Sequence, residues 1–209
     1  AAHSFVSYDM SDEINIMNIN FNSTLYLANS LKEISPNSRF FFAGSSEMFG
    51  NPELSPQNEN SKFNPRSIYG IAKVSSYYLL KNFRDKDDFF TVTGIMYNHE
   101  SPRRGNQFVT KKIISTAVKI KLGKEDVLEL GNLDALRDWG YAPDYVYAMW
   151  LLLQQKEPSD YIISTGILHS VREFVEIVFS YLDLDYQDYV VINKDFYRES
   201  EKIALCGDA

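Results

Sequence analysis

Long segments with helical spacing of apolar residues alternate along this chain with short runs that are apolar throughout. In the first segment Ile16, Ile19 and Leu27 recur at helical spacing, and Ser11 is well placed to cap a helix that ends before Pro36. Similar patterns predict helices over residues 68–84 (capped by Ser67), 108–122, 145–155 and 171–182, and strands over residues 39–44, 89–96, 127–130 and 161–164.

The predicted strands are continuously apolar rather than alternating, which is typical of strands buried on both faces of a parallel sheet. Because they alternate with helices, we expect an α/β fold with a doubly wound parallel sheet. The polar residues 51–66 and the charged residues 98–106 are predicted to be loops. After residue 96 helices and strands alternate less regularly, so the second half is predicted to form a smaller lobe interwoven with the sheet.

Composition narrows the possible functions. The 209 residues are 44% apolar and 23% charged, as in a globular domain, and a net charge of -7 argues against a broad nucleic-acid-binding surface. The single cysteine, Cys206, excludes an intrachain disulfide and a cysteine-based zinc site, and it favours a reducing, cytoplasmic setting. The longest apolar run, residues 148–153, is too short to span a membrane. We therefore expect no metal, nucleic-acid or membrane partner.

The first chemical motif is Tyr-Gly-Ile-Ala-Lys, from Tyr69 to Lys73. On a helix these two residues share one face, and a nearby cation favours the phenolate, so Tyr69 could act as a base towards a sugar hydroxyl. In a chain of this composition, chance alone supplies about one such pair. On spacing alone, an exposed tyrosine and lysine on a helix surface is therefore the stronger interpretation.

The second motif, AGSSEMFG at residues 43–50, directly follows a predicted strand. Open α/β sheets bind ligands at the carboxyl ends of their strands, where Ser45 could bind a substrate hydroxyl and Glu47 could transfer protons. The alternative is a simple turn in which Ser45 or Ser46 caps the local backbone.

Three further strings carry arginine beside glycine or aromatic residues. In YNHESPRRGN, residues 97–106, the paired arginines suit phosphate recognition, whereas a solvated loop is the alternative and His99 alone is more typical of a structural hydrogen bond. Arg137 in LRDWG and Arg198 in FYRESE suit diphosphate and base contacts. As isolated strings, both more often indicate a surface ion pair and a packed aromatic residue.

Taken together, these strings resemble the extended short-chain dehydrogenase/reductase superfamily, and within it the GDP-mannose 4,6-dehydratases, along essentially the whole chain. Ser-Ser-Glu, followed 22 residues after the glutamate by Tyr-x-x-x-Lys, is typical of sugar-nucleotide dehydratases. The strings at 98–105 and 130–140 are narrower and are similar to the GDP-mannose dehydratases and close relatives.

The resemblance implies a Rossmann-like fold. Residues 1–98 are then expected to be the C-terminal half of an NADP-binding Rossmann domain, and residues 99–209 mainly a substrate lobe, with 132–160 returning to the Rossmann domain. No glycine spacing matches G-x-G-x-x-G, and the chain begins with Ala1 rather than methionine. We therefore expect the first βαβ units to lie upstream of Ala1, and the 209 residues alone to bind NADP weakly.

The resemblance also implies an activity: conversion of GDP-mannose to GDP-4-keto-6-deoxymannose by NADP-dependent internal redox and loss of water. Tyr69 is then the base at O4, Lys73 tunes it and holds the cofactor, Glu47 is the C5 base and C6 acid, and Ser45 replaces the usual threonine. His99 and Arg104 match cofactor-binding positions. Positions that contact the GDP-sugar are matched by Ser46, Asn98, Lys112, Arg137, Arg198 and Glu201.

Several alternatives and one departure accompany this assignment. The enzyme could instead be a dehydratase, reductase or epimerase for a related nucleotide sugar such as GDP-manno-heptose, or the chain a non-catalytic GDP-sugar-binding subunit. Glu199 stands where the family usually has proline.

The helices over residues 16–31 and 68–84 carry apolar residues on more than one face, so a homodimer or homotetramer is expected.

Overall fold

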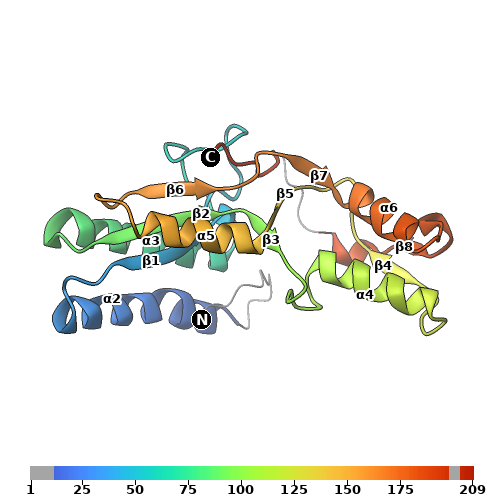
Figure 1. Ribbon diagram of the computed structural model, residues 1–209, viewed down its shortest axis with the longest axis horizontal. Coiled ribbons are helices and arrows are strands. Elements are labelled where there is room, and N and C mark those ends of the chain that lie inside the picture. The colour runs from blue at the N-terminus through green and yellow to red at the C-terminus, as the bar shows by residue number, and fades with distance from the viewer. Residues whose placement is uncertain (1–11, 198–202) are drawn as a thin grey trace.

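The computed structural model describes residues 12–197 and 203–209, so Ser11, Arg198 and Glu201 lie outside the described residues. Its main sheet is parallel and has the strand order β1-β2-β6 (Figure 1). The three strands are β1 (Phe40–Ser45), β2 (Thr91–Met96) and β6 (Asp160–Ile163). The predicted α/β fold with a parallel sheet is therefore confirmed.

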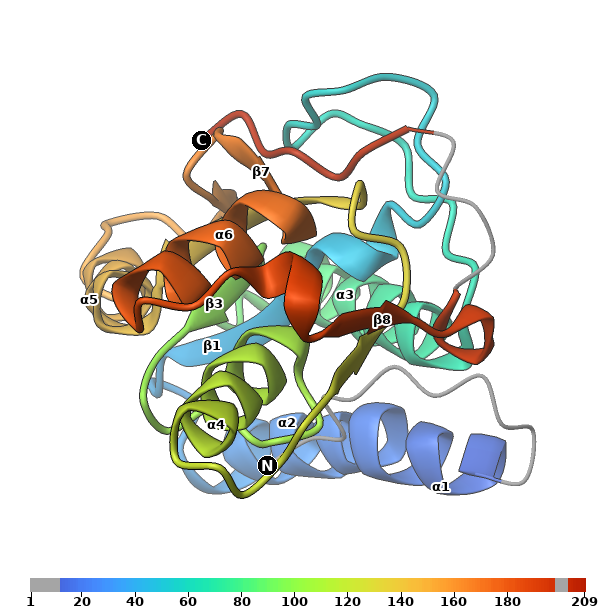
Figure 2. The same cartoon turned by 90° about the vertical axis from the view of Figure 1, so that its right-hand side faces the viewer.

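Helices cover both faces of this sheet (Figures 1 and 2). Phe42 packs in a cluster with α2 (Ser23–Ile34) and α3 (Ile68–Asp87) on one face. Phe41, the neighbouring residue of β1, packs with α5 (Ala142–Leu152) on the other. Successive side chains of a strand point to opposite faces, so these continuously apolar strands require a helical layer on each side.

The N-terminal helix has the predicted extent but an unpredicted interruption. Between α1 (Glu13–Met17) and α2 the chain makes a π-helical segment, η2 (Asn18–Asn22). The carbonyl of Asn20 accepts hydrogen bonds from Thr24 Oγ1 at 2.9 Å and from Ser76 Oγ of α3 at 3.1 Å. The wider turn therefore helps to join this helix to α3.

The second helix, α3, begins where the sequence predicts. Ser67 caps it, since its Oγ accepts a hydrogen bond from Gly70 N at 3.1 Å. The helix runs beyond the expected end at residue 84, and Arg84 binds the Asp160 carboxylate of β6 through two contacts of 2.9 and 2.6 Å. This bidentate pair fixes the far end of α3 against the sheet.

A second lobe follows β2, at the right of Figure 1. Its core packs α4 (Val109–Lys121) and α6 (Val171–Tyr181) against β4 (Leu128–Leu130), which pairs in parallel with β8 (Val190–Ile192). Short 3₁₀ turns complete the described elements: η3 (Ser46–Met48), η4 (Tyr186–Asp188) and η5 (Lys194–Phe196). The helices lie close to their predicted ranges, whereas β8 was not predicted.

A small sheet lies between the main sheet and the lobe core (Figure 1). In it β5 (Leu136–Tyr141) pairs in parallel with β3 (Asn98–Glu100) and antiparallel with β7 (Leu168–Ser170). We expected a loop at 98–106 and a return to the Rossmann domain over 132–160. The loop prediction is wrong for residues 98–100, which form β3. The domain bounds stay a prediction: β5 lies in the small sheet, and β6, which ends at Ile163, lies in the main sheet.

The buried carboxylate of Asp138 on β5 connects the small sheet to the turn after β6 and to Gly207 near the last residue. Its oxygens accept hydrogen bonds from Thr165 N and Oγ1 at 2.9 and 2.6 Å, from Gly166 N at 3.0 Å and from Gly207 N at 3.2 Å. Gln57 in the 51–66 loop also forms an isolated bridge with Gly207. The last residues of the chain are thereby held against both the small sheet and the long loop. Within the described ranges, no helix is both long and apolar enough to span a membrane.

Candidate active site

The SSE and YxxxK motifs meet because α3 starts directly against the turn that follows β1. Ser45 ends β1, and its Oγ accepts a hydrogen bond from Glu47 N at 3.3 Å, which begins the turn η3. A side chain at Gly70 would place its Cβ only 2.6 Å from the carbonyl oxygen of Glu47. The absence of a side chain at Gly70 therefore allows Tyr69 to approach both residues.

Tyr69 is buried, with 8% of its surface exposed, and hydrogen-bonds to the Ser45 side chain. Burial raises the pKa of Tyr69 above its ordinary value, the Ser45 bond lowers it, the Glu47 charge raises it and the Arg104 charge lowers it. We expected a nearby cation to favour the phenolate. The Arg104 cation does act in that direction, but burial is the largest effect, so the net shift of the Tyr69 pKa is upward.

Lys73 lies one helical turn further along α3 and is 4% exposed. Its Nζ donates to the Ala43 carbonyl oxygen at 2.9 Å and lies 5.6 Å from the centroid of the Tyr69 ring. Burial lowers the pKa of Lys73 to about 8. Its other two N–H groups have no acceptor among the residues that the structure describes, so they are available to a ligand.

Glu47 supplies an unused acceptor beside this pair. Its Oε2 is buried and has no hydrogen-bond partner within the described parts of the chain. A buried carboxylate oxygen without a donor is costly, by about 1–3 kcal/mol or more for a charged group, and such groups often mark a site of chemistry. The arrangement can therefore hold two proton-transfer groups, a phenol and a carboxyl, at the edge of one sheet.

The strand β3 brings His99 to the same edge of the molecule. His99 Nδ1 lies 2.8 Å from the Tyr97 carbonyl oxygen, and its ring stacks on Tyr145 of α5 with centroids 4.8 Å apart. The neighbouring Asn98 pairs in register with Trp139 of β5. His99 is thus structurally bonded, and its ring is held at the junction between the main sheet and the lobe.

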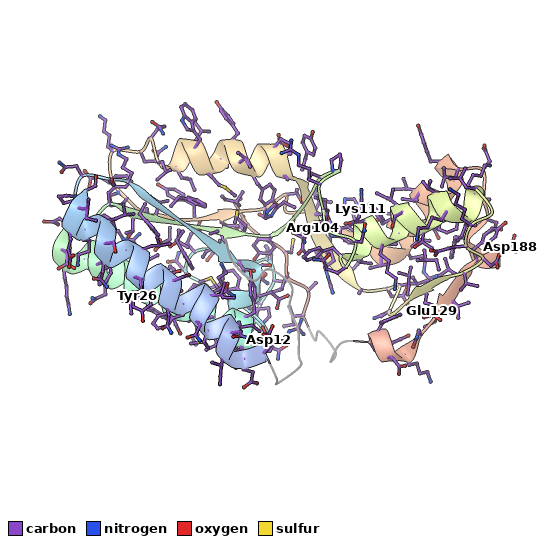
Figure 3. The ribbon with its side chains drawn as sticks, turned by 90° about the horizontal axis from the view of Figure 1, so that it is seen from below. Asp12, Tyr26, Arg104, Lys111, Glu129 and Asp188 are labelled. Carbon is purple, nitrogen blue, oxygen red and sulfur yellow. The ribbon has the colours of Figure 1, made fainter. Side chains whose placement is uncertain are left out.

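Arg104 is held at the same junction, where Figure 3 shows it close to Lys111 of α4. Its Nε lies 3.2 Å from Glu100 Oε2, and its guanidinium carbon lies 3.5 Å from the centroid of the Phe108 ring. Thr110 Oγ1 donates to the same Glu100 oxygen at 2.5 Å. The guanidinium is therefore oriented by an anion and an aromatic ring before any ligand binds.

The other predicted site residues occupy the turn and the lobe. Ser46 is buried in η3. Lys112 Nζ lies 4.1 Å from the centroid of the Phe196 ring, and Arg137 Nη1 donates to the Leu136 carbonyl oxygen at 2.6 Å. Arg198 and Glu201 are outside the described residues. In the described portion no three metal-ligating side chains form a group that could hold an ion.

Sequence reasoning did not identify four residues that shape this region: Glu100, Phe108, Asp138 and Tyr145. The i,i+4 spacing of Glu100 and Arg104 was a usable signal for their ion pair. Nothing local to Asp138 or Tyr145 indicates their partners, because those partners come from distant segments.

Comparison with known proteins identifies the family. The family model described as GDP-mannose 4,6 dehydratase matches residues 1–209. The chain belongs to this family. It is 47% identical over 171 residues to GDP-mannose 4,6 dehydratase 2 of Arabidopsis thaliana, covering 82% of this chain and 46% of that protein. It is 53% identical over 144 residues to the Homo sapiens GDP-mannose 4,6 dehydratase, covering 69% and 39% respectively.

Comparison with solved structures agrees with the predicted fold. RMD from Pseudomonas aeruginosa, solved in complex with NADPH, superimposes with a TM-score of 0.90 at 22% identity, over 100% of this chain and 70% of that one. The chain spans about half the length of the curated relatives it matches. Membership of the dehydratase family and the Rossmann-like fold predicted from sequence are thus confirmed.

The burial of Lys73 predicts a pH dependence of stability. Below about pH 8 the folded and unfolded states both carry its charge, so the cost of burying that charge is fully present. From about pH 8 to 10 the folded state loses the proton first, so the free energy of unfolding should rise with pH. Urea unfolding of the wild type and of Lys73→Met across this range measures the effect. The free energy of unfolding of the wild type should rise with pH relative to that of the variant. Parallel curves of this free energy against pH would contradict the prediction.

Proposed function

We propose that the protein converts GDP-mannose to GDP-4-keto-6-deoxymannose as a hydro-lyase. Membership of the GDP-mannose 4,6 dehydratase family supports the substrate. The observation that carries the reaction class is the buried Oε2 of Glu47, which has no hydrogen-bond partner among the described residues and lies beside the Tyr69–Ser45 pair. Oxidation at C4 needs one base, whereas elimination of water needs a second proton-transfer group, and this site has both.

We propose NADP as the cofactor. Bound there, it would accept a hydride from C4 of the sugar and return it to C6. The fit rests on Lys73, whose two unused N–H groups can donate to the hydroxyls of a ribose, and on the prearranged Arg104 guanidinium. His99 is the third proposed contact. The described residues contain no glycine-rich turn for the pyrophosphate.

Tyr69 is proposed to take the proton from the sugar O4. Its raised pKa means that the free site holds the neutral phenol, which is hydrogen-bonded to the Ser45 side chain. A positive charge brought close to the ring would favour the phenolate. Ser45 then orients the substrate hydroxyl, and Lys73 keeps the adjacent helix turn fixed to β1 through the Ala43 carbonyl.

Glu47 is proposed to remove the proton at C5 and to protonate the hydroxyl that leaves C6. Its backbone is held by the Ser45 cap and by contact with Gly70, while the carboxylate oxygen stays unbonded. This role favours a dehydratase over an epimerase, because epimerisation at C4 needs no base at C5. The GDP moiety is assigned to Ser46, Asn98, Lys112, Arg137, Arg198 and Glu201.

Glu47→Gln tests the reaction class. In the full-length protein the amide keeps the side-chain shape but removes the base, so formation of the 4-keto-6-deoxy sugar should fall by about 100–10,000-fold. Glu53→Gln, which changes an exposed carboxylate in the 51–66 loop, is the matched control and should leave the rate unchanged. Product analysis with deuterium at C4 should show no label at C6 in Glu47→Gln. Near-wild-type product formation would refute the mechanism.

Arg137→Ala tests the GDP site. A charge-assisted contact to phosphate contributes ~1.5–3 kcal/mol, so GDP binding should weaken by roughly 10–100-fold. Calorimetry of GDP binding to the full-length protein makes the measurement. Arg172→Ala, which removes an arginine of the same lobe that pairs with Asp134, is the control and should bind GDP normally. Equal affinity in both variants would remove Arg137 from the site.

We further propose a homodimer, or a homotetramer built from it, in a cytoplasmic setting where the buried Cys206 stays reduced. The dimer is assigned to α1, α2 and α3, because these helices carry large exposed apolar side chains: Ile14, Tyr26, Leu27, Ile71 and Tyr78. Figure 3 shows Tyr26 on the outer side of α2.

Tyr26→Glu combined with Leu27→Lys should therefore convert the full-length protein to a smaller species, because charges replace apolar contact area. Sedimentation velocity at several concentrations measures the change. Tyr181→Glu, which alters an equally large exposed side chain on the lobe, should leave sedimentation unaltered. A wild-type protein that sediments as a monomer at every concentration would reject the interface.

A further inference from the structure

The His99 ring is fixed on one edge and on one face by groups that do not themselves react. On its edge, Nδ1 lies 2.8 Å from the Tyr97 carbonyl oxygen. On its face, the ring of Tyr145 stacks at 4.8 Å between centroids with 26° between the planes. These two contacts define both the position and the rotation of the imidazole.

The edge contact determines which nitrogen carries the proton. A carbonyl oxygen can only accept, so Nδ1 must donate and the neutral ring must be the Nδ1–H tautomer. Nε2 is then an acceptor, and within the described residues nothing donates to it. Because Nε2 lies across the ring from Nδ1, its lone pair points away from the backbone of Tyr97.

The face contact depends on a glycine. Tyr145 is only 3% exposed, and its hydroxyl is buried without a hydrogen-bond partner in the described structure. Its contact with His99 is therefore made by the aromatic ring alone. Gly140, which pairs in register with His99 across β3 and β5, lies under that ring. A Cβ at Gly140 would lie 2.3 Å from Tyr145 Cε2 and 2.8 Å from its hydroxyl oxygen. Any side chain there would displace Tyr145 from the stack.

We infer that Tyr145, which lies against Gly140, is a positioning residue: its stacking keeps the His99 ring turned so that Nδ1 donates to the Tyr97 carbonyl oxygen. The resulting Nδ1–H tautomer leaves Nε2 to accept a hydrogen bond from an amide N–H or a hydroxyl of the ligand. An unprotonated nitrogen repels anionic oxygen, so His99 in this state does not recognise phosphate. That task falls to guanidinium groups such as Arg104. The assignment of the ligand rests on the proposed function, whereas the tautomer and the role of Tyr145 do not.

Long-range proton–nitrogen NMR of the ¹⁵N-histidine-labelled chain tests the tautomer directly. At mildly alkaline pH, where imidazole is neutral, the nitrogen that couples strongly to both ring carbon protons is Nε2. Among the three histidines, His99→Gln identifies the signal. An unprotonated Nε2 at His99 supports the inference, and a protonated one overturns it whatever the variants do.

Three variants test the positioning role. Tyr145→Phe keeps the ring and should retain the Nδ1–H tautomer, whereas Tyr145→Leu removes the stack and should give a mixture of tautomers. Gly140→Ala should behave like Tyr145→Leu, because it displaces the same ring. A pure Nδ1–H signal in both Tyr145→Leu and Gly140→Ala would show that Tyr145 does not position His99.

The ligand assignment is tested by NADP affinity in the full-length protein. Tyr145→Leu should weaken NADP binding by about 2–10-fold, the effect expected for loss of one neutral hydrogen bond. Its GDP affinity should be unchanged, and Tyr145→Phe should bind NADP like the wild type. Equal NADP affinity in Tyr145→Leu and wild type would overturn this part of the inference. Absence of NADP binding to the wild type would instead refute the proposed cofactor, while the NMR result would still decide the tautomer.

Discussion

The close approach of α3 to the turn after β1 is the constraint on which the candidate site depends. The first turn of the helix can lie against the Glu47 carbonyl only because Gly70 has no side chain. That contact fixes how far α3 stands above the sheet, and Lys73 then reaches the Ala43 carbonyl at 2.9 Å. Two motifs separated in sequence thus share one rigid frame, anchored at its far end by the Arg84–Asp160 pair.

Burial in that frame moves both titratable groups towards their neutral forms. The pKa of Tyr69 is raised and that of Lys73 is lowered to about 8, in each case mainly by loss of water. Ser45 and Arg104 oppose the effect on Tyr69, while Glu47 adds to it. A nearby cation favours the phenolate, so a cationic ligand group would shift Tyr69 towards that form. In the proposed reaction, Tyr69 would then act as the base only when the site is filled.

The sequence predicted those features that short-range chemistry decides. Ser67 and the apolar spacing after it located the start of α3, and the i,i+4 spacing placed Tyr69 and Lys73 on one face. It did not predict the π-helical segment, whose freed Asn20 carbonyl bonds to Ser76 in another helix. The strands β3 and β7 were missed because three residues are too few to show a pattern. The strand β5 has six residues but no continuous apolar run, and it forms by pairing with both of these distant segments. The direction of the Tyr69 pKa shift was also unpredictable, since burial is a property of the packed protein.

The second lobe is connected to the main sheet through long-range hydrogen bonds. Asp138 is 1% exposed, and its carboxylate gathers donors from the turn after β6 and from Gly207 near the end of the chain. Before the undescribed residues 198–202, the chain contacts Lys112 of α4 through Phe196; after them, it is pinned at Gly207. The described residues on either side of this gap therefore contact different parts of the molecule, Phe196 the lobe and Gly207 the small sheet. Because Arg137 precedes Asp138 on the same strand, the carboxylate that closes this connection also fixes where that arginine stands. The hydrogen bonds of Asp138 to the backbone thus set the geometry in which the sugar nucleotide is proposed to bind.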